Sequence, residues 1–265
     1  MHLLSEPPYP SSLTDPTAGW IFTTAMPIIF GIAVLAVVID TYHNKRFSVV
    51  SLMFLAGTTM FWIEWPADWG SYLVYNREFP MFEGWTSTWF QTYWKPVPVV
   101  FGYGIFYGIS AVLLTKALPA AKRRFSSVSP TLVVVLTSLV IFYIFDFAAE
   151  KTMTSLGWYS YAEPVGPAWY GEKGNMSFVW PILPFLLFAV TESLILDRVD
   201  ANGVYPNERL FRVHKLPEGF HREERRLAAW IVSLNVTLFI CQPLILILGR
   251  TVLGIGVGDQ SLYNP

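Results

Sequence analysis

Long apolar stretches separated by short polar connections dominate the chain. A helix needs about 20 mostly apolar residues to cross a bilayer, because only a helix pairs its own backbone groups where water is absent. Six stretches meet this requirement: residues 19–41, 47–65, 97–117, 129–149, 176–195 and 227–249. The pattern therefore predicts an all-α integral membrane protein, a bundle of about six transmembrane helices in a single domain over residues 1–265.

Lys and Arg gather in alternate connections between these stretches. The connection after the first stretch carries two, residues 116–124 carry four and residues 198–226 carry seven, whereas the opposite side carries five in all. Positively charged connections stay in the cytoplasm, so we expect both termini to be non-cytoplasmic, in a bacterial plasma membrane. The basic connection 198–226 is then expected to contact anionic membrane lipid.

Composition excludes several classes of function. Only 14% of the residues are charged, against roughly 25% in an average soluble domain. The net charge is −1, which provides no field to attract nucleic acid, so we expect no nucleic-acid partner. The single cysteine, Cys241, and four scattered histidines lack the spacing of metal ligands, and we expect neither a metal ion nor another cofactor.

Four carboxyl groups stand where two of the apolar stretches end, on the side opposite the basic connections. Glu64 closes the second stretch and Asp68 follows it, while Asp146 and Glu150 are four residues apart near the end of the fourth stretch and share a helix face. Ionisable groups at membrane depth are costly and indicate function. Apolar surroundings favour the neutral, proton-donating form of a carboxyl group. Glu64 and Asp146, flanked by aromatic residues, are therefore the first candidates for catalysis, followed by Asp68 and Glu150; the alternative is that these groups are solvated at the membrane interface.

Aromatic residues crowd the connections on the same side. Residues 69–94 contain ten of them and residues 158–170 contain five. Trp and Tyr also collect at bilayer interfaces for reasons unrelated to catalysis. Aromatic rings above carboxyl groups can nevertheless exclude water and stabilise a developing cation, which suits acid-promoted chemistry on an apolar small molecule. The candidate substrate-binding residues are Trp62, Trp65, Trp69, Tyr72, Trp158, Tyr161 and Gln242.

Other polar and small residues in the apolar stretches are expected to serve the fold. Glu192 and Asn235 are predicted to pair with Arg198 or Arg226 near the cytoplasmic side. Gly104 and Gly108 form a small-xxx-small pair that lets a neighbouring helix approach closely, so we expect them to be packing residues.

Several segments together resemble the AveC-type spirocyclase family of actinobacterial polyketide pathways. They are the Glu64-Trp65-Pro66 to Asn76 segment, Asp146-Phe147 with Glu150, the run Gly157-Trp158-Tyr159-Ser160-Tyr161, the turn from Asp197 to Gly203, and Arg225-Arg226-Leu227-Ala228. The likeness extends from Trp62 to Asn235. The resemblance implies an integral membrane enzyme that closes a dihydroxyketone into a spiroketal, in some members with dehydration, and it assigns no catalytic residue.

Spiroketal closure needs a proton for the departing hemiketal oxygen, a stabilised oxocarbenium ion and a base for the attacking hydroxyl. Two carboxyl groups of unequal acidity suffice for this without a cofactor, so either Asp146 or Glu64 is expected to be the acid while the other stabilises charge. Two alternatives remain open. One is a membrane terpene cyclase acting on a prenylated substrate, and the other is a non-catalytic membrane subunit or scaffold.

Overall fold

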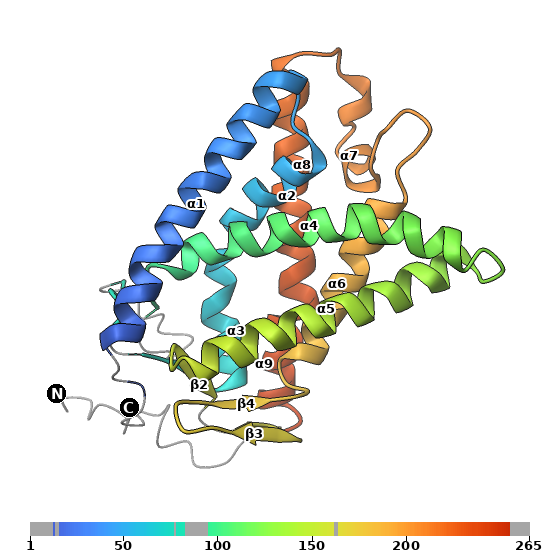
Figure 1. The fold of residues 1–265 in the computed structure, drawn as a ribbon. Helices are drawn as coiled ribbons and strands as arrows, with labels where there is room; N and C mark the ends of the chain where they lie inside the picture. Colours follow the sequence, from blue (N-terminus) through green and yellow to red (C-terminus); the bar gives the residue numbers. More distant parts are fainter. Residues whose placement is uncertain (1–12, 14–15, 77, 83–94, 162–163, 255–265) are drawn as a thin grey trace.

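The computed structural model describes residue 13 and residues 16–76, 78–82, 95–161 and 164–254 (Figure 1). Most of these residues are helical, and the predicted all-α class is confirmed. Five stretches are long and apolar enough to cross a membrane by length and composition: Pro16–Asn44, Val49–Ser71, Val99–Arg124, Pro130–Ser155 and Phe220–Thr251.

The elements follow one another with short connections. The helices are α1 (Pro16–Asn44), α2 (Val49–Thr58), α3 (Glu64–Ser71), α4 (Val99–Arg124), α5 (Pro130–Ser155), α6 (Ile182–Asp197), α7 (Pro206–Leu210), α8 (Phe220–Cys241) and α9 (Pro243–Thr251). The 3-10 turn Thr59–Ile63 connects α2 to α3, and a second 3-10 turn, Val213–Lys215, follows α7. The strands β1 (Leu73–Tyr75) and β2 (Tyr159–Tyr161) pair antiparallel, as do β3 (Ala168–Tyr170) and β4 (Asn175–Ser177).

Several predicted spans differ from the observed helices. The second, predicted over 47–65, is divided into α2, the 3-10 turn Thr59–Ile63 and α3 and continues to Ser71, so Glu64 begins α3 and does not close the span. The fourth continues to Ser155, so Asp146 lies nine residues before the end of α5, about 14 Å inside it. The stretch predicted over 176–195 begins as strand β4, and its helix α6 has 16 residues, a length of about 24 Å. The last stretch breaks at Pro243, which lacks an N–H for the helix and clashes with the preceding turn, so it forms both α8 and α9.

Helices α2 and α4 pack closely in the centre of the molecule (Figure 1). The small residues at their contact allow this approach: Gly57 of α2 lies against Tyr107, while Gly104 and Gly108 of α4 lie against Phe54. The expected packing role of Gly104 and Gly108 is confirmed. The core around this pair is apolar, with Leu52, Met53, Ala111 and Leu114 fully buried.

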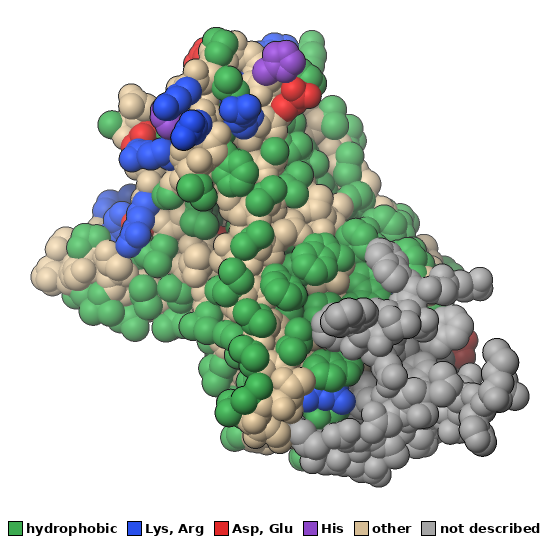
Figure 2. Space-filling view, turned by 180° about the vertical axis from the view of Figure 1, so that it is seen from behind, with side chains coloured by type: hydrophobic (Ala, Val, Ile, Leu, Met, Phe, Trp, Pro, Cys, Tyr) green, Lys and Arg blue, Asp and Glu red, His purple; other side chains and the backbone are tan. Residues whose placement is uncertain are grey.

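The outer faces of the long helices carry many exposed apolar side chains. On α1, which lies along one side of the molecule, exposed residues include Trp20, Ile28, Ile32, Leu35 and Val38. Figure 2 shows hydrophobic side chains over the middle of the visible face, whereas most of the visible Lys and Arg gather at one end. Such an apolar surface is what a helix bundle presents to lipid.

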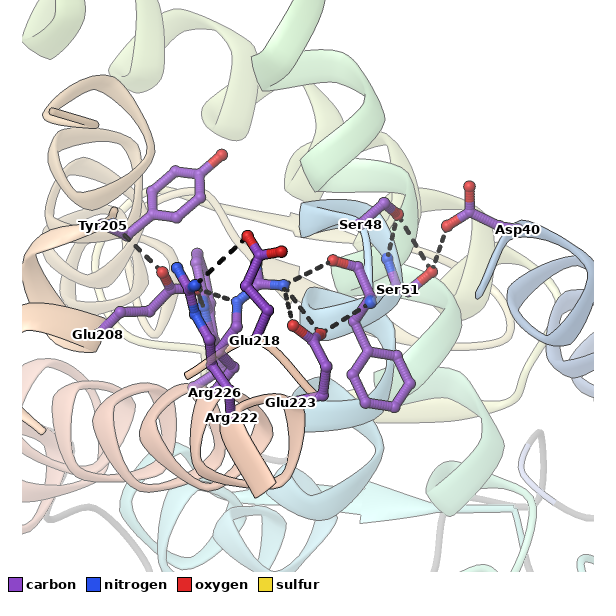
Figure 3. A network of polar contacts seen from close by, with 11 residues as sticks. Asp40, Ser48, Ser51, Tyr205, Glu208, Glu218, Arg222, Glu223 and Arg226 are labelled. Carbon is purple, nitrogen blue, oxygen red and sulfur yellow. Dashed lines mark hydrogen bonds and ion pairs between the residues drawn. The ribbon is translucent and has the colours of Figure 1, made fainter. Parts of the chain in front are cut away.

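A network of polar contacts joins helices at the end of the molecule that carries α7 (Figure 3). Arg226 of α8 donates from Nε to Glu208 of α7 at 3.0 Å, from Nη1 to Glu223 at 2.9 Å, and from Nη1 to the carbonyl of Phe47 at 3.1 Å. Glu208 also accepts a bond from the indole N–H of Trp230 at 3.0 Å. We call Arg226, Glu208, Glu223, Trp230 and the Phe47 backbone the arginine network. Arg226 thus serves the fold, but its partners are not those expected from the sequence.

Candidate functional site

The short sheet β1–β2 joins the two segments that carry the candidate carboxyl groups. Strand β1 follows α3, which bears Glu64 and Asp68, and β2 follows α5, which bears Asp146 and Glu150. The register places Leu73 opposite Tyr161 and Tyr75 opposite Tyr159. The sheet therefore brings two regions of the chain, 84 residues apart in sequence at the paired positions Tyr75 and Tyr159, to one end of the bundle.

A sharp turn at Tyr72 directs the chain from α3 into β1. Tyr72 ends α3 with a φ of 58°, in the left-handed region. A non-glycine residue there costs about 1–2 kcal/mol, so the surrounding packing must compensate for it. Its side chain is fully buried, and the guanidinium of Arg250 from α9 lies 4.2 Å from its ring and 4.0 Å from the ring of Trp69.

Glu64 is held by two tyrosine hydroxyl groups. Tyr75 of β1 donates to Oε1, and Tyr103 of α4 donates to Oε2. Both oxygens of this half-buried side chain therefore accept a hydrogen bond from a different element. The two hydrogen bonds therefore fix the orientation of the carboxyl group between α4 and β1.

Asp68 lies one turn further along α3 and pairs with Lys95. Both side chains are buried, with exposed fractions of 4% for Asp68 and 2% for Lys95. The ammonium group of Lys95 also lies 5.4 Å from the centre of the Tyr75 ring. A buried ion is costly unless it is paired, so removing either partner leaves an uncompensated charge beside Glu64.

The two carboxyl groups of α5 differ in their partners. Tyr161 of β2 donates its hydroxyl to Oε2 of Glu150 at 2.7 Å. Asp146 lies one turn before Glu150, and across the described part of the chain no side chain donates a hydrogen bond to it. Among the four carboxyl groups, Asp146 is thus the one to which no described side chain donates a hydrogen bond.

Burial and the neighbouring carboxyl groups raise the pKa of two tyrosines of the sheet. Burial raises the pKa of Tyr75 well above its ordinary value, and the charges of Asp68 and Glu64 raise it further. Burial likewise raises the pKa of Tyr159, with added contributions from Glu150 and Asp146. These phenols consequently stay protonated and remain donors at neutral pH.

We call the following residues the carboxylate–tyrosine cluster: Glu64, Asp68, Asp146, Glu150, Tyr75, Tyr103, Tyr159, Tyr161 and Lys95. Among the residues predicted for the site, the structure brings together the four carboxyl groups and Tyr161. These groups interact electrostatically across the two halves, since Glu64 acts on both Asp68 and Glu150.

Other predicted substrate-binding residues have different surroundings. The indole N–H of Trp62 donates to Asn235 of α8 at 2.6 Å, and its ring stacks on Phe239. Asn235 donates in turn to Thr59 at 2.8 Å, so the expectation that it pairs with arginine is wrong.

The remaining predicted residues contact neighbours outside the carboxylate–tyrosine cluster or lie at a helix junction. Trp158 packs on Phe22 of α1 with ring centres 4.2 Å apart, and Trp65 is buried near Phe82. Gln242 lies at the junction between α8 and α9. The predicted aromatic residues Trp85, Trp89, Phe90, Tyr93 and Trp94 lie outside the described residues.

The sequence reasoning did not assign Tyr75, Tyr103, Tyr159 or Lys95 to the site. For Tyr103 a signal was present, because Tyr103, Tyr107 and Ser110 recur at i, i+4 and i+7 and place three hydroxyl groups on one face of an apolar helix. For Lys95 only the tertiary structure shows the partner, since Asp68 lies 27 residues earlier and on another element.

One of three comparisons with known proteins identifies the family of the chain. The family model described as "Spirocyclase AveC-like" matches residues 44–253, a range that includes every residue of the carboxylate–tyrosine cluster. The searches of curated proteins and of solved structures gave no match. The match covers most of the chain and confirms the resemblance seen in the sequence. The chain belongs to the AveC-like spirocyclase family.

Proposed function

We propose that the protein is a cofactor-free acid–base cyclase that closes an apolar, polyketide-like dihydroxyketone into a spiroketal in a bacterial plasma membrane. The observation that carries the proposal is the contrast between two carboxyl groups of one cluster. Glu64 accepts hydrogen bonds from Tyr75 and Tyr103, whereas Asp146 accepts none from the side chains that the structure describes. Family membership supports spiroketal closure over the cyclisation of a prenylated substrate.

The reaction needs one proton donor and one proton acceptor. One hydroxyl of the substrate first adds to the ketone to give a hemiketal. A proton on the hemiketal hydroxyl then lets it leave as water, and an oxocarbenium ion remains. The second hydroxyl attacks this carbon and loses its proton to a base. One water is released, and the proton supplied equals the proton recovered.

The cluster contains a group for each step. Asp146 is proposed as the acid that protonates the departing oxygen. Glu64, oriented by its two tyrosines, is proposed as the carboxylate that stabilises the oxocarbenium ion and then accepts the proton of the attacking hydroxyl. The Asp68–Lys95 pair and the Glu150–Tyr161 hydrogen bond hold the two halves of the cluster in place.

The apolar setting suits the proposed substrate. The rings of Tyr75, Tyr159 and Tyr161 surround the carboxyl groups, and their pairwise centres are 5.7 Å and 6.1 Å apart along the sheet. Aromatic faces stabilise a cation, and the exclusion of water prevents its capture by hydrolysis. A hydrophobic chain would reach the cluster from the lipid phase rather than from water.

The test uses the purified protein in lipid nanodiscs with a symmetrical δ,δ′-dihydroxyketone that carries alkyl chains. Spiroketal formation is measured by mass spectrometry and by chiral chromatography, after subtraction of spontaneous closure. Wild type should give a spiroketal of one configuration in excess. Glu64→Gln and Asp146→Asn should lose this activity while their unfolding temperatures stay near that of wild type.

Glu78→Gln is the matched control, because Glu78 is an exposed carboxyl group three residues after the end of strand β1. It should keep full activity. The proposal is wrong if both amide variants keep wild-type rates, or if the wild-type protein instead converts a prenylated epoxide into a carbocycle. If the wild-type protein leaves both compounds unchanged, this result favours the alternative of a non-catalytic membrane scaffold.

A further inference from the structure

Glu192 is a further acidic residue of the apolar core, and it lies outside the carboxylate–tyrosine cluster. Its side chain is fully buried on α6. The sequence predicted an ion pair with Arg198 or Arg226, and this prediction is wrong: Oε1 of Glu192 instead accepts a hydrogen bond from the hydroxyl of Ser110 on α4, at 3.1 Å. Its second oxygen, Oε2, has no hydrogen-bond partner among the residues that the structure describes.

A buried polar atom without a partner requires an explanation. An ionised carboxylate in apolar surroundings is far more costly than a neutral acid group. Few such groups are retained in a core unless they have a role. Phe188 lies one turn before Glu192 on the same face of α6, and its ring contacts that of Tyr107 with centres 5.5 Å apart, so this face of α6 packs against α4.

A row of hydroxyl groups on α4 leads from Glu64 towards Glu192. Tyr103 donates to Glu64, Ser110 donates to Glu192, and Tyr107 lies between them on the same helix face. The rings of Tyr103 and Tyr107 have centres 6.2 Å apart. The phenol of Tyr107 interacts electrostatically with Glu192, Asp146 and Glu64.

We infer that Glu192 stores a proton and, through the hydroxyl row Tyr103, Tyr107 and Ser110, resets the acid and the base of the cluster between turnovers. This inference rests on the proposed function. Glu192 acts through Asp146 and Glu64 and does not touch the substrate.

The proton balance of the proposed reaction creates the need for such a group. One turnover leaves Asp146 without its proton and Glu64 with one proton too many, so the next turnover cannot begin until a proton moves from Glu64 to Asp146. Protonated Glu192 gives its proton to Asp146 through the Tyr107 hydroxyl, which accepts one proton and releases another. The Glu192 carboxylate, held by Ser110, then recovers a proton from Glu64 along the same row.

The experiment separates the first turnover from those that follow. With enzyme in excess over the δ,δ′-dihydroxyketone, Glu192→Gln should close the spiroketal at a rate within about twofold of wild type, because its acid and base begin in the correct forms. With substrate in excess, its kcat should fall about tenfold or more at unchanged KM, and product should appear as a burst of one equivalent.

Tyr107→Phe tests the row itself, and it keeps the ring that packs on Phe188. It should show the same burst followed by slow turnover. Ser138→Ala is the matched control, since Ser138 is also a buried serine of the core, and among the described residues its hydroxyl bonds within α5, to the carbonyl of Val134 at 2.7 Å. This variant should turn over like wild type.

Two results would overturn the inference. One is wild-type kcat in both Glu192→Gln and Tyr107→Phe. The other is an equal loss of the first-turnover and steady-state rates, which indicates a structural role. Failure of the proposed function itself gives a different result, in which the wild-type protein forms no more spiroketal than Asp146→Asn.

Discussion

The arginine network and the carboxylate–tyrosine cluster both gather acidic side chains in the bundle, but they compensate for them differently. In the arginine network, two glutamates share the guanidinium of Arg226, and Glu208 gains a further bond from Trp230. In the cluster, four carboxyl groups have one ion-pair partner that the structure describes, Lys95. Tyrosine hydroxyls take the other positions around Glu64 and Glu150.

This difference separates a network in which the carboxylates stay ionised from a cluster in which the carboxyl groups can exchange protons. Arginine stays protonated in proteins and offers only donors, so a carboxylate beside it stays ionised. A tyrosine hydroxyl both donates and accepts, and it leaves its carboxyl partner free to take up a proton. The arginine network therefore suits stability, and the cluster suits proton transfer.

The largest expected effect comes from exchanging the carboxyl group for an amide in each region. Glu64→Gln should lower kcat about 10²- to 10⁴-fold with little change in the free energy of unfolding, because it removes the proposed base but keeps the side-chain shape. Glu208→Gln should instead destabilise the protein and leave the activity of the folded fraction intact. Spiroketal assays and thermal unfolding of both variants measure the two quantities; equal effects of the two changes on activity would remove the distinction.

The next effect concerns the cation of the arginine network. Arg226→Met should lower the free energy of unfolding by about 3 kcal/mol, because Glu208, whose side chain is 3% exposed, then keeps a buried charge without its partner. The matched control is Arg222→Met, whose partner Glu218 is 95% exposed at 3.7 Å and which should cost far less. Denaturant unfolding in detergent micelles gives both values. Equal losses would mean that the network adds no stability of its own.

The tyrosine bonds to Glu64 should have smaller effects. Tyr75→Phe and Tyr103→Phe each remove one donor from the carboxylate, and each should lower kcat about tenfold with KM little changed. Because both bonds act on one side chain, the double variant should depart from the product of the single losses. Tyr42→Phe, at an exposed position of α1, controls for the loss of a hydroxyl alone. Unchanged rates in the double variant would show that Glu64 does not need these donors.

Much of the bundle follows from local features of the sequence, whereas the composition of the site does not. The apolar stretches defined the long helices, and Gly104 and Gly108 identified a close helix contact. The predictions failed where tertiary contacts decide: α6 begins six residues later than the predicted span because the chain first pairs as β4.

The carboxyl groups of the site could be predicted because charge is conspicuous in an apolar segment. Their partners could not, because Tyr75 meets Glu64 only after the left-handed turn at Tyr72, and Tyr103 reaches it from another helix. Glu192 shows the same limit, since its partner Ser110 lies 82 residues earlier in the chain.

The smallest expected effect concerns Asp200, in the connection between α6 and α7. The backbone N–H groups of Val204 and Asn202 and the guanidinium of Arg209 bond to this carboxylate and lower its pKa below the ordinary value. A carboxyl group with a lowered pKa in the folded state stabilises the protein above its unfolded pKa and loses this contribution as the pH falls. Asp200→Asn should therefore lower the unfolding temperature slightly at pH 7, and the difference from wild type should shrink as the pH falls through about 4. Glu218→Gln, at an exposed carboxyl group, should show no such convergence. A difference that stays constant down to acid pH would mean that Asp200 acts through its shape and not through its charge, unlike the glutamates that Arg226 holds.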